Sequence, residues 1–243
     1  MTTTGRVVGV LGGMGPDATV DFMSKVVACT PAKHDHDHIR MLVNHNPQVP
    51  DRQIDTDEQR KAVRATLADM AQGLQDAGAE FLVMPCNTAH GFLDDVYERV
   101  DIPFLNIVTE TVHAIRRAYP DASAVGVMAT DACLNAELYQ SAIRDAGMSV
   151  IVPSADVQTL LMELISRIKC GDQSSDVADE MARCANSLVQ LGAQVIAGGC
   201  TEIPLVLNAE NLSVPFVSST DVLAERTVAL GLNQEPLANQ LRS

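Results

Sequence analysis

Two cysteines occupy matching places in two similar segments of this chain. Cys86 follows the apolar run AEFLVMP, and Cys200 follows the apolar run AQVIAGG. Polar residues come next in both cases, Asn-Thr after the first cysteine and Thr-Glu after the second. A thiol at the start of a helix loses its proton more readily, because the positive end of the helix dipole stabilises the thiolate. Two such thiols suit the inversion of a carbon stereocentre, in which a base removes a proton from one face and an acid returns one to the other.

Taken singly, either cysteine is also typical of a buried structural thiol, and it is the repetition that favours chemistry. The other four cysteines lack this symmetry. Cys29 and Cys184 stand in helical patterns and are expected in the core, whereas Cys133 and Cys170 are expected near the functional site. Because no leader sequence is evident, the six cysteines do not predict a disulfide framework.

The elements that carry these thiols alternate along the chain. Short apolar, β-branched runs are separated by helical patterns, which predicts an α/β fold with parallel sheets covered on both faces. The two halves also match, VVGVLGG with AVGVMAT and IPFLNIVTE with VPFVSSTDV. We therefore expect two similar lobes related by a pseudo-twofold axis, each a roughly four-stranded parallel sheet flanked by helices, with the active site in the cleft between them. Lobe 1 would comprise residues 1–98 plus 212–243 and carry Cys86; lobe 2 would comprise 99–211 and carry Cys200.

Composition and net charge restrict the classes of molecule that the chain is expected to bind. The 243 residues include 31 acidic and 17 basic ones, a net charge of −14, which argues against nucleic acid and anionic membranes as partners. No apolar run approaches the ~20 residues that span a bilayer. Aromatic residues make up only 3% of the chain, so stacking of bases or sugars is not expected. We expect a small-molecule ligand and, since the start resembles no signal peptide, a cytoplasmic protein.

Five motifs together make the chain recognisable. It resembles the aspartate/glutamate racemase family, the cofactor-independent two-cysteine amino-acid racemases, and most of all the aspartate racemase branch. The resemblance implies that Cys86 and Cys200 are the catalytic thiols, that neither pyridoxal phosphate nor a metal takes part, and that the chain forms a homodimer. The motifs, in chain order, are GGMGPDAT (12–19), NPQVPDR (46–52), MPCNTAH (84–90), IKCGD (168–172) and GGCTEIPL (198–205).

The resemblance also implies a set of substrate-binding residues. Arg52 and Lys169 would bind the side-chain carboxylate of the substrate, a role that suits Arg because its guanidinium can bind a carboxylate with two hydrogen bonds. Either cation, taken alone, is also compatible with an ordinary surface charge. The residues expected around the α-carboxylate and amino group, together with the others in the motifs, are Met14, Asn87, Thr88, Thr130, Thr201 and Glu202.

One loop departs from the family pattern, and the identity of the substrate therefore stays open. Thr130 is followed by Asp131 and Cys133, where the family has more Thr and Gly. An added carboxylate near an anionic ligand leaves room for glutamate, or for a neutral or cationic side chain, beside aspartate. The alternatives are a related enzyme of the superfamily (a racemase of another amino acid, a hydantoin racemase, a decarboxylase or an isomerase) and a non-catalytic amino-acid-binding protein.

Two further patterns have simpler interpretations. Residues 13–18 come close to a dinucleotide fingerprint, but no acidic residue ends the next strand, so we expect a backbone nest at a helix start, with Pro16 in the first turn. The alternating His and Asp residues of 34–38 are expected to form a surface loop, because adjacent residues rarely converge on a metal.

Overall fold

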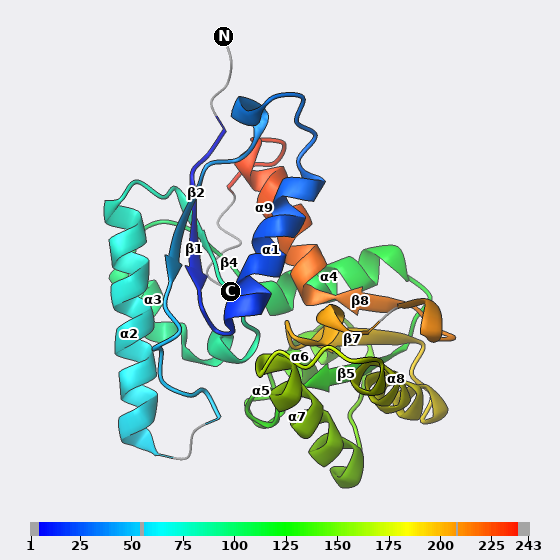
Figure 1. Cartoon of the computed structure of the whole chain (residues 1–243). Coiled ribbons are helices and arrows are strands. Elements are labelled where there is room, and N and C mark those ends of the chain that lie inside the picture. Colours follow the sequence, from blue (N-terminus) through cyan, green and yellow to red (C-terminus); the bar gives the residue numbers. More distant parts are fainter. Residues whose placement is uncertain (1–4, 54–55, 208, 238–243) are drawn as a thin grey trace. The chain divides into compact units, whose positions relative to one another are not determined.

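The computed structural model describes residues 5–53, 56–207 and 209–237 (Figure 1). The chain divides into two compact units. Unit 1 comprises Met1–Ile107 and Leu223–Ser243, and unit 2 comprises Val108–Val222. The ends of the expected lobe 1, residues 1–4 and 238–243, lie outside the described part of the chain.

Unit 1 contains a four-stranded parallel sheet with the strand order β2-β1-β3-β4. The longest helix of the unit starts at an N-cap, Thr56, whose hydroxyl accepts a hydrogen bond from the Gln59 amide at 3.3 Å, and acidic residues occupy its first turn. The elements are β1 (Val8–Gly12), α1 (Pro16–Cys29), η1 (Asp35–Asp37), β2 (Met41–His45), α2 (Asp57–Asp76), β3 (Phe81–Val83), η2 (Thr88–Phe92), α3 (Asp94–Arg99) and β4 (Phe104–Leu105).

Unit 2 repeats this plan with the strand order β6-β5-β7-β8, again all parallel. Two more helices, α4 (Ile107–Ala118) and α9 (Ser219–Gly231), contain the points at which the chain passes from one unit to the other. The remaining elements are β5 (Ala124–Ala129), α5 (Asp131–Asn135), α6 (Leu138–Asp145), β6 (Ser149–Ile151), α7 (Ala155–Lys169), α8 (Ser175–Gln190), β7 (Val195–Gly199), η3 (Ile203–Leu205), η4 (Ala209–Asn211) and β8 (Phe216–Ser218).

The repetition extends to side-chain packing inside each unit. A Cβ atom added to Gly9 of β1 would lie 2.7 Å from Leu82 and 2.9 Å from Ala79. A Cβ atom added to Gly126 of β5 would lie 2.7 Å from Ile196 and 3.0 Å from Ala193. Each glycine thus lets its strand approach the neighbouring segment closely at the same place. The expected α/β fold with two similar four-stranded parallel sheets is confirmed.

The boundaries between the units differ from the expected ones. The sequence placed them after residues 98 and 211, whereas the structure has them after Ile107 and Val222. The reason is strand pairing. β4 pairs with β3 and so belongs to the first sheet, and β8 pairs with β7 and so belongs to the second.

Two helical stretches of unit 2 are short. The helices α5 and α6 are separate, because Glu137 adopts a left-handed backbone conformation (φ 51°) between them. Between Cys200 and β8, the described residues form the two short 3₁₀ turns η3 and η4. Pro204 lies in the first turn of η3, where the backbone N–H of a helix has no internal partner.

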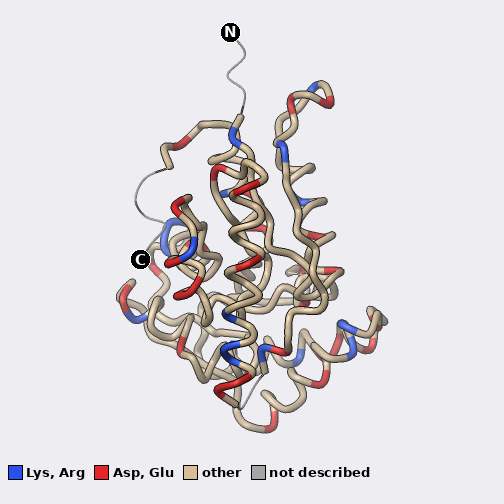
Figure 2. The backbone as a smooth tube through the Cα atoms, turned by 90° about the vertical axis from the view of Figure 1, so that its left-hand side faces the viewer, with Lys and Arg blue, Asp and Glu red and all other residues tan. Residues whose placement is uncertain are grey.

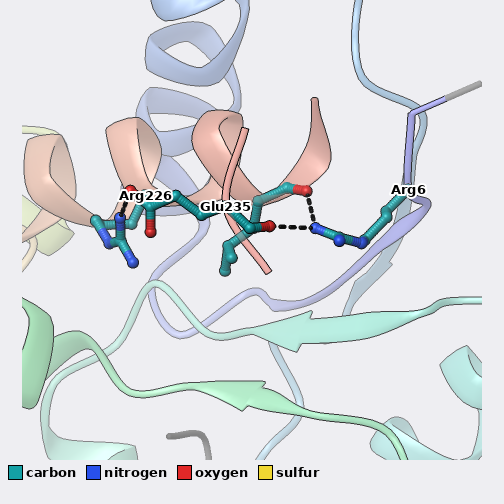
Figure 3. Close-up of polar contacts among 4 residues, drawn as sticks. Arg6, Arg226 and Glu235 are labelled. Carbon is teal, nitrogen blue, oxygen red and sulfur yellow. Dashed lines mark hydrogen bonds and ion pairs between the residues drawn. The ribbon is translucent and has the colours of Figure 1, made fainter. Parts of the chain in front are cut away.

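The C-terminal part of unit 1 is attached to the segment before β1 by polar contacts (Figure 3). The Arg6 guanidinium donates hydrogen bonds to the carbonyl oxygens of Leu230 (2.6 Å) and Glu235 (3.0 Å). The Glu235 carboxylate in turn accepts a hydrogen bond from Arg226 of α9 at 2.6 Å. Glu235 therefore lies between two arginines, one from the segment before β1 and one from α9.

Charged residues of both signs are interspersed along the chain (Figure 2). Pairs such as Lys25–Asp21 on α1 and Arg99–Asp69 between α3 and α2 are partly or largely exposed and contribute little to stability. Within the described residues, no helix combines the length and the apolar character needed to cross a membrane.

Candidate active site

The first cysteine lies at the carboxyl end of β3 in unit 1. Cys86 is buried, and so are the two residues that follow it, Asn87 and Thr88. Met14, at the end of the neighbouring strand β1, belongs to the same buried cluster as Cys86. Because ligands of open parallel sheets bind beyond the carboxyl ends of the strands, these residues lie where a substrate would be held.

The loop after β1 uses one of its amides internally. Gly13 has a positive φ of 95°, and a Cβ there would lie 2.5 Å from the backbone of Asn46, so only glycine fits. Its N–H donates to the Thr19 hydroxyl at 2.8 Å, and that hydroxyl donates to the Gly15 carbonyl at 3.0 Å. Helix α1 begins at Pro16, as expected, but Thr19 already binds one amide of the expected nest.

Arg52 follows β2, the other neighbour of β1. Its side chain is half-buried, and Nη1 donates to the carbonyl oxygens of Val49 (3.3 Å) and Pro50 (3.2 Å). These contacts fold the guanidinium back on its own loop. In unit 1, Met14, Arg52 and the Cys86 segment thus each follow one of three adjacent strands.

His90, the last residue of the MPCNTAH motif, has defined polar contacts. It is 7% exposed. Its Nδ1 lies 2.8 Å from the Cys86 carbonyl oxygen, and its Nε2 accepts a hydrogen bond from the Ile107 amide at 3.2 Å. Burial lowers the pKa of His90 to about 4, against the opposing effect of hydrogen bonds to the backbone of Cys86 and Leu105. The ring is therefore neutral near pH 7.

The second cysteine lies at the carboxyl end of β7 in unit 2, beside a buried carboxylate. The Cys200 thiol donates a hydrogen bond to Oε2 of Glu202 at 3.0 Å, and the Thr201 hydroxyl donates to the same oxygen at 3.3 Å. Glu202 is 3% exposed, and its other oxygen, Oε1, is buried without a hydrogen-bond partner among the described residues. This oxygen can accept a hydrogen bond from a ligand.

The environment of Cys200 overturns the expectation of a thiol activated by a helix start. Burial and the Glu202 carboxylate raise the pKa of the Cys200 thiol well above its ordinary value, and the positive charge of Lys169 opposes them. The chain continues into the three-residue turn η3, too short to have an appreciable dipole. Cys200 is therefore protonated near pH 7 and suited to act as an acid.

Lys169, the last residue of α7, is exposed and close enough to Cys200 to affect its pKa. The turn after it is held by an ion pair that the sequence did not reveal. Asp172 binds Arg167 at 2.7 Å and accepts a hydrogen bond from the Ser174 amide at 3.1 Å. The contacts with Ser174 and Arg167 lower the pKa of Asp172 to about 2. Asp172 is the last residue of the IKCGD motif, which also contains Lys169. Its place in this motif was the sequence signal that could have pointed to the ion pair.

Thr130 lies at the carboxyl end of β5, next to β7. Its hydroxyl accepts a hydrogen bond from the Cys133 amide at 3.3 Å and so caps α5. The unusual Asp131 is exposed, and its carboxylate accepts a hydrogen bond from Gln158 of α7 at 2.7 Å. The Asp131 carboxylate beside Thr130 is therefore oriented by a residue that the sequence did not suggest.

No group of three potential metal-ligating side chains occurs within residues 5–53, 56–207 and 209–237. In the run of alternating His and Asp residues, the Asp37 carboxylate accepts hydrogen bonds from the Lys33 amide (2.9 Å) and the His34 amide (2.8 Å). These contacts lower the pKa of Asp37 and close a turn of 3₁₀ helix. Asp37 thus has a structural use within the segment.

Comparison with known proteins identifies the family. The family model described as Asp/Glu/hydantoin racemase matches residues 11–227. The chain belongs to the Asp/Glu/hydantoin racemase family. The matched region contains both cysteine segments. The expected resemblance to this family is confirmed.

Individual relatives of this racemase-family chain agree. It is 31% identical over 231 residues to the broad-specificity amino-acid racemase RacX of Bacillus subtilis, covering 92% of this chain and 97% of that one. It is 32% identical over 165 residues to a glutamate racemase of Herpetosiphon aurantiacus, covering 65% and 62%. Among solved structures, the aspartate racemase of Picrophilus torridus has a TM-score of 0.81 at 24% identity, covering 94% and 95%, and supports the fold.

Proposed function

We propose that the chain is an amino-acid racemase independent of pyridoxal phosphate, which interconverts L- and D-aspartate, with glutamate as a further substrate, by proton transfer at Cα. The observation that carries this proposal is the duplicated placement of Cys86 and Cys200, each buried at the carboxyl end of the equivalent strand of its sheet. A reaction that removes a proton from one face of a carbon and returns one to the other requires two such groups.

The proposed step conserves protons. The Cys86 thiolate takes the α-proton and becomes a thiol, and the Cys200 thiol gives its proton to the opposite face of the carbanion and becomes a thiolate. The reverse reaction exchanges the two roles. The hydrogen bond from Cys200 to Glu202 and the raised pKa of Cys200 support its role as the acid in this direction.

The other residues bind the substrate in this proposal. Asn87, Thr88 and Thr201 hold the α-carboxylate and amino group, and the buried Oε1 of Glu202 accepts a hydrogen bond from the α-ammonium. Arg52 and Lys169 bind the side-chain carboxylate. Met14 and Thr130, which follow β1 and β5, are the remaining residues that bind the substrate. A homodimer and a cytoplasmic location remain predictions from the resemblance and the sequence.

Asp131 favours a second candidate, a racemase that accepts neutral or cationic side chains. Its exposed carboxylate lies directly after Thr130 and repels a second carboxylate on the substrate. One relative is named a broad-specificity amino-acid racemase. Incubating each L-amino acid separately, without added cofactor, and separating the products by chiral chromatography will distinguish the two. Preference for aspartate supports the first candidate, and preference for uncharged or basic amino acids supports the second.

The two-base mechanism is tested with Cys86→Ser and Cys200→Ser. We expect each to lower kcat of racemisation by about 10³-fold or more, because each removes one proton carrier. Cys184→Ser is the matched control, since Cys184 is equally buried but lies in α8 among core residues. In deuterated water, the α-proton of the amino acid identified by the screen should be replaced by deuterium, which NMR detects. Substantial racemisation by either variant contradicts the mechanism, and binding without any α-exchange supports a non-catalytic binding protein.

A further inference from the structure

His90 connects the segment of the first cysteine to the start of a helix. It lies in η2, four residues after Cys86, and its ring contacts Phe104 of β4 edge-on, with the centroids 5.7 Å apart. One ring nitrogen faces the Cys86 carbonyl, and the other faces the amide of Ile107, the first residue of α4. The first amides of a helix have no partner within the helix, so His90 supplies one from outside.

Beside the backbone of Leu105, the ring contacts Cys86 and Ile107, and these last two contacts indicate the tautomer. The Ile107 amide can only donate, so Nε2 must be the acceptor and carries no proton. Nδ1 therefore carries the proton of the neutral ring and donates it to the Cys86 carbonyl oxygen at 2.8 Å. A protonated ring would place an N–H against the Ile107 N–H and break that contact. The arrangement therefore needs a neutral histidine with one defined tautomer.

The carbonyl that His90 binds belongs to the peptide group between Cys86 and Asn87. A hydrogen bond to this oxygen fixes the orientation of the peptide plane, and with it the directions of the Cys86 side chain and the Asn87 amide. Both residues are at least nine-tenths buried, with 6% and 2% exposure. In such a packed position, a small rotation of the peptide would shift the thiol relative to a substrate.

We propose that His90 is a positioning residue for Cys86, which acts as the neutral Nδ1–H tautomer and ties the Cys86 carbonyl to the first amide of α4. The inference rests on the proposed function in that Cys86 is taken as a proton carrier. The orientation of the Cys86 peptide by His90 can nevertheless be measured without any turnover. At Cys200, by contrast, the carbonyl oxygen accepts a hydrogen bond from the backbone amide of Ile203 at 3.2 Å, and Glu202 contacts the thiol itself.

Two substitutions separate the two hydrogen bonds. In His90→Asn, the amide nitrogen can take the place of Nδ1, so the bond to the Cys86 carbonyl is kept and that to Ile107 is lost. In His90→Gln, the amide oxygen can take the place of Nε2, so the bond from Ile107 is kept and that to Cys86 is lost. His113→Gln is the matched control, because His113 of α4 is exposed.

The experiment compares kcat for racemisation, thermal unfolding, and the pH dependence of Cys86 alkylation by iodoacetamide, followed by mass spectrometry of its peptide. We expect His90→Gln to lose about 10- to 100-fold in kcat, the scale for a reacting group displaced by about 1 Å, and to change the alkylation profile. We expect His90→Asn to retain kcat within about threefold and the wild-type profile, since the bond that orients the thiol is kept.

The outcomes separate the two proposals. If both variants unfold at lower temperature but keep the wild-type kcat and Cys86 alkylation profile, His90 is a packing residue and the inference is wrong. If Cys86→Ser still racemises, the proposed function is wrong, while the alkylation profiles still decide the role of His90. For variants that fail to fold, ¹⁵N NMR of the wild-type protein tests the tautomer: Nδ1–H supports the inference, and Nε2–H overturns it.

Discussion

At the scale of single residues, the two cysteine segments differ in how their thiols are controlled. Cys86 has its own carbonyl bound by a neutral histidine, whereas the Cys200 thiol donates a hydrogen bond to a buried carboxylate. The duplicated sequence suggested two equivalent thiols. The structure instead gives each a different partner, which is compatible with proton carriers that start a reaction in opposite protonation states.

The Glu202 carboxylate helps to raise the pKa of the Cys200 thiol. Glu202→Gln removes the negative charge that helps to raise the pKa of Cys200, so that pKa should fall. Alkylation of the Cys200 peptide by iodoacetamide should then begin at lower pH than in the wild type. Glu163→Gln, on the exposed side of α7, is the control and should leave the profile unchanged. An unchanged or upward-shifted profile in Glu202→Gln would contradict the assigned charge effect.

His90 predicts a dependence of stability on pH. Its pKa is about 4 in the folded protein and 6.5 in the unfolded chain. Between these values the unfolded chain takes up a proton that the folded protein does not, so the free energy of unfolding falls as the pH falls. The loss approaches about 3 kcal/mol once both states are protonated. Urea unfolding at about pH 7 and about pH 4.5 should show a smaller loss in His90→Asn than in the wild type; equal losses would refute this contribution.

At the scale of elements, the candidate site residues follow the carboxyl ends of the strands, and side-chain contacts stabilise some of the segments that connect helices and strands. Met14, Arg52 and the Cys86 segment follow the adjacent strands β1, β2 and β3, respectively. In unit 2, the turn between α7 and α8 is held by the Arg167–Asp172 pair, directly after Lys169. Parallel pairing explains the first arrangement, and one local ion pair explains the second.

Arg6 is expected to anchor the C-terminal segment of unit 1. Arg6→Ala removes two charge-assisted hydrogen bonds to the carbonyl groups of Leu230 and Glu235 and should destabilise the protein by about 1–2 kcal/mol. Arg40→Ala is the control, because Arg40 is exposed. Chemical unfolding measures both. A loss in Arg6→Ala no larger than in Arg40→Ala would show that these contacts do not anchor the C-terminal segment.

At the scale of the whole molecule, the chain contains the same packing arrangement twice. Gly9 and Gly126 each let a strand approach an Ala and a larger aliphatic side chain at equivalent places. Such agreement between strand order and local packing is expected of an internal duplication. It also allows one substitution to be compared in two copies within one protein.

Gly9→Ala and Gly126→Ala should each destabilise the protein by about 1–3 kcal/mol, because the added Cβ overpacks a filled site. The two losses should be similar, and they should add in the double variant since the sites share no neighbours. Gly73→Ala is the control: no atom lies within 4 Å of its added Cβ, and this helical position should gain about 0.5–1 kcal/mol. Thermal or urea unfolding decides, and a neutral effect at either strand glycine would contradict the packing argument.

The sequence by itself determined the class of fold, the duplication and the family. Apolar runs of strand length, alternating with helical patterns, are local properties that composition and spacing reveal. The order GGMGPDAT, NPQVPDR, MPCNTAH, IKCGD and GGCTEIPL sufficed for the resemblance. The unit boundaries were less predictable, because β4 and β8 join sheets through partners distant along the chain.

Only the tertiary structure decided the chemical state of the candidate groups. The pKa values of Cys200 and His90 depend on burial and on which charges and hydrogen-bond partners lie within a few ångströms. The helix-dipole argument predicted an activated Cys200, but the chain continues into a short 3₁₀ turn, and burial and the Glu202 carboxylate raise the pKa of the thiol. His90 could equally have been a packing residue until its two ring nitrogens were placed against one carbonyl and one amide. Periodicity indicates which face of an element is buried, but not what each buried polar atom meets there.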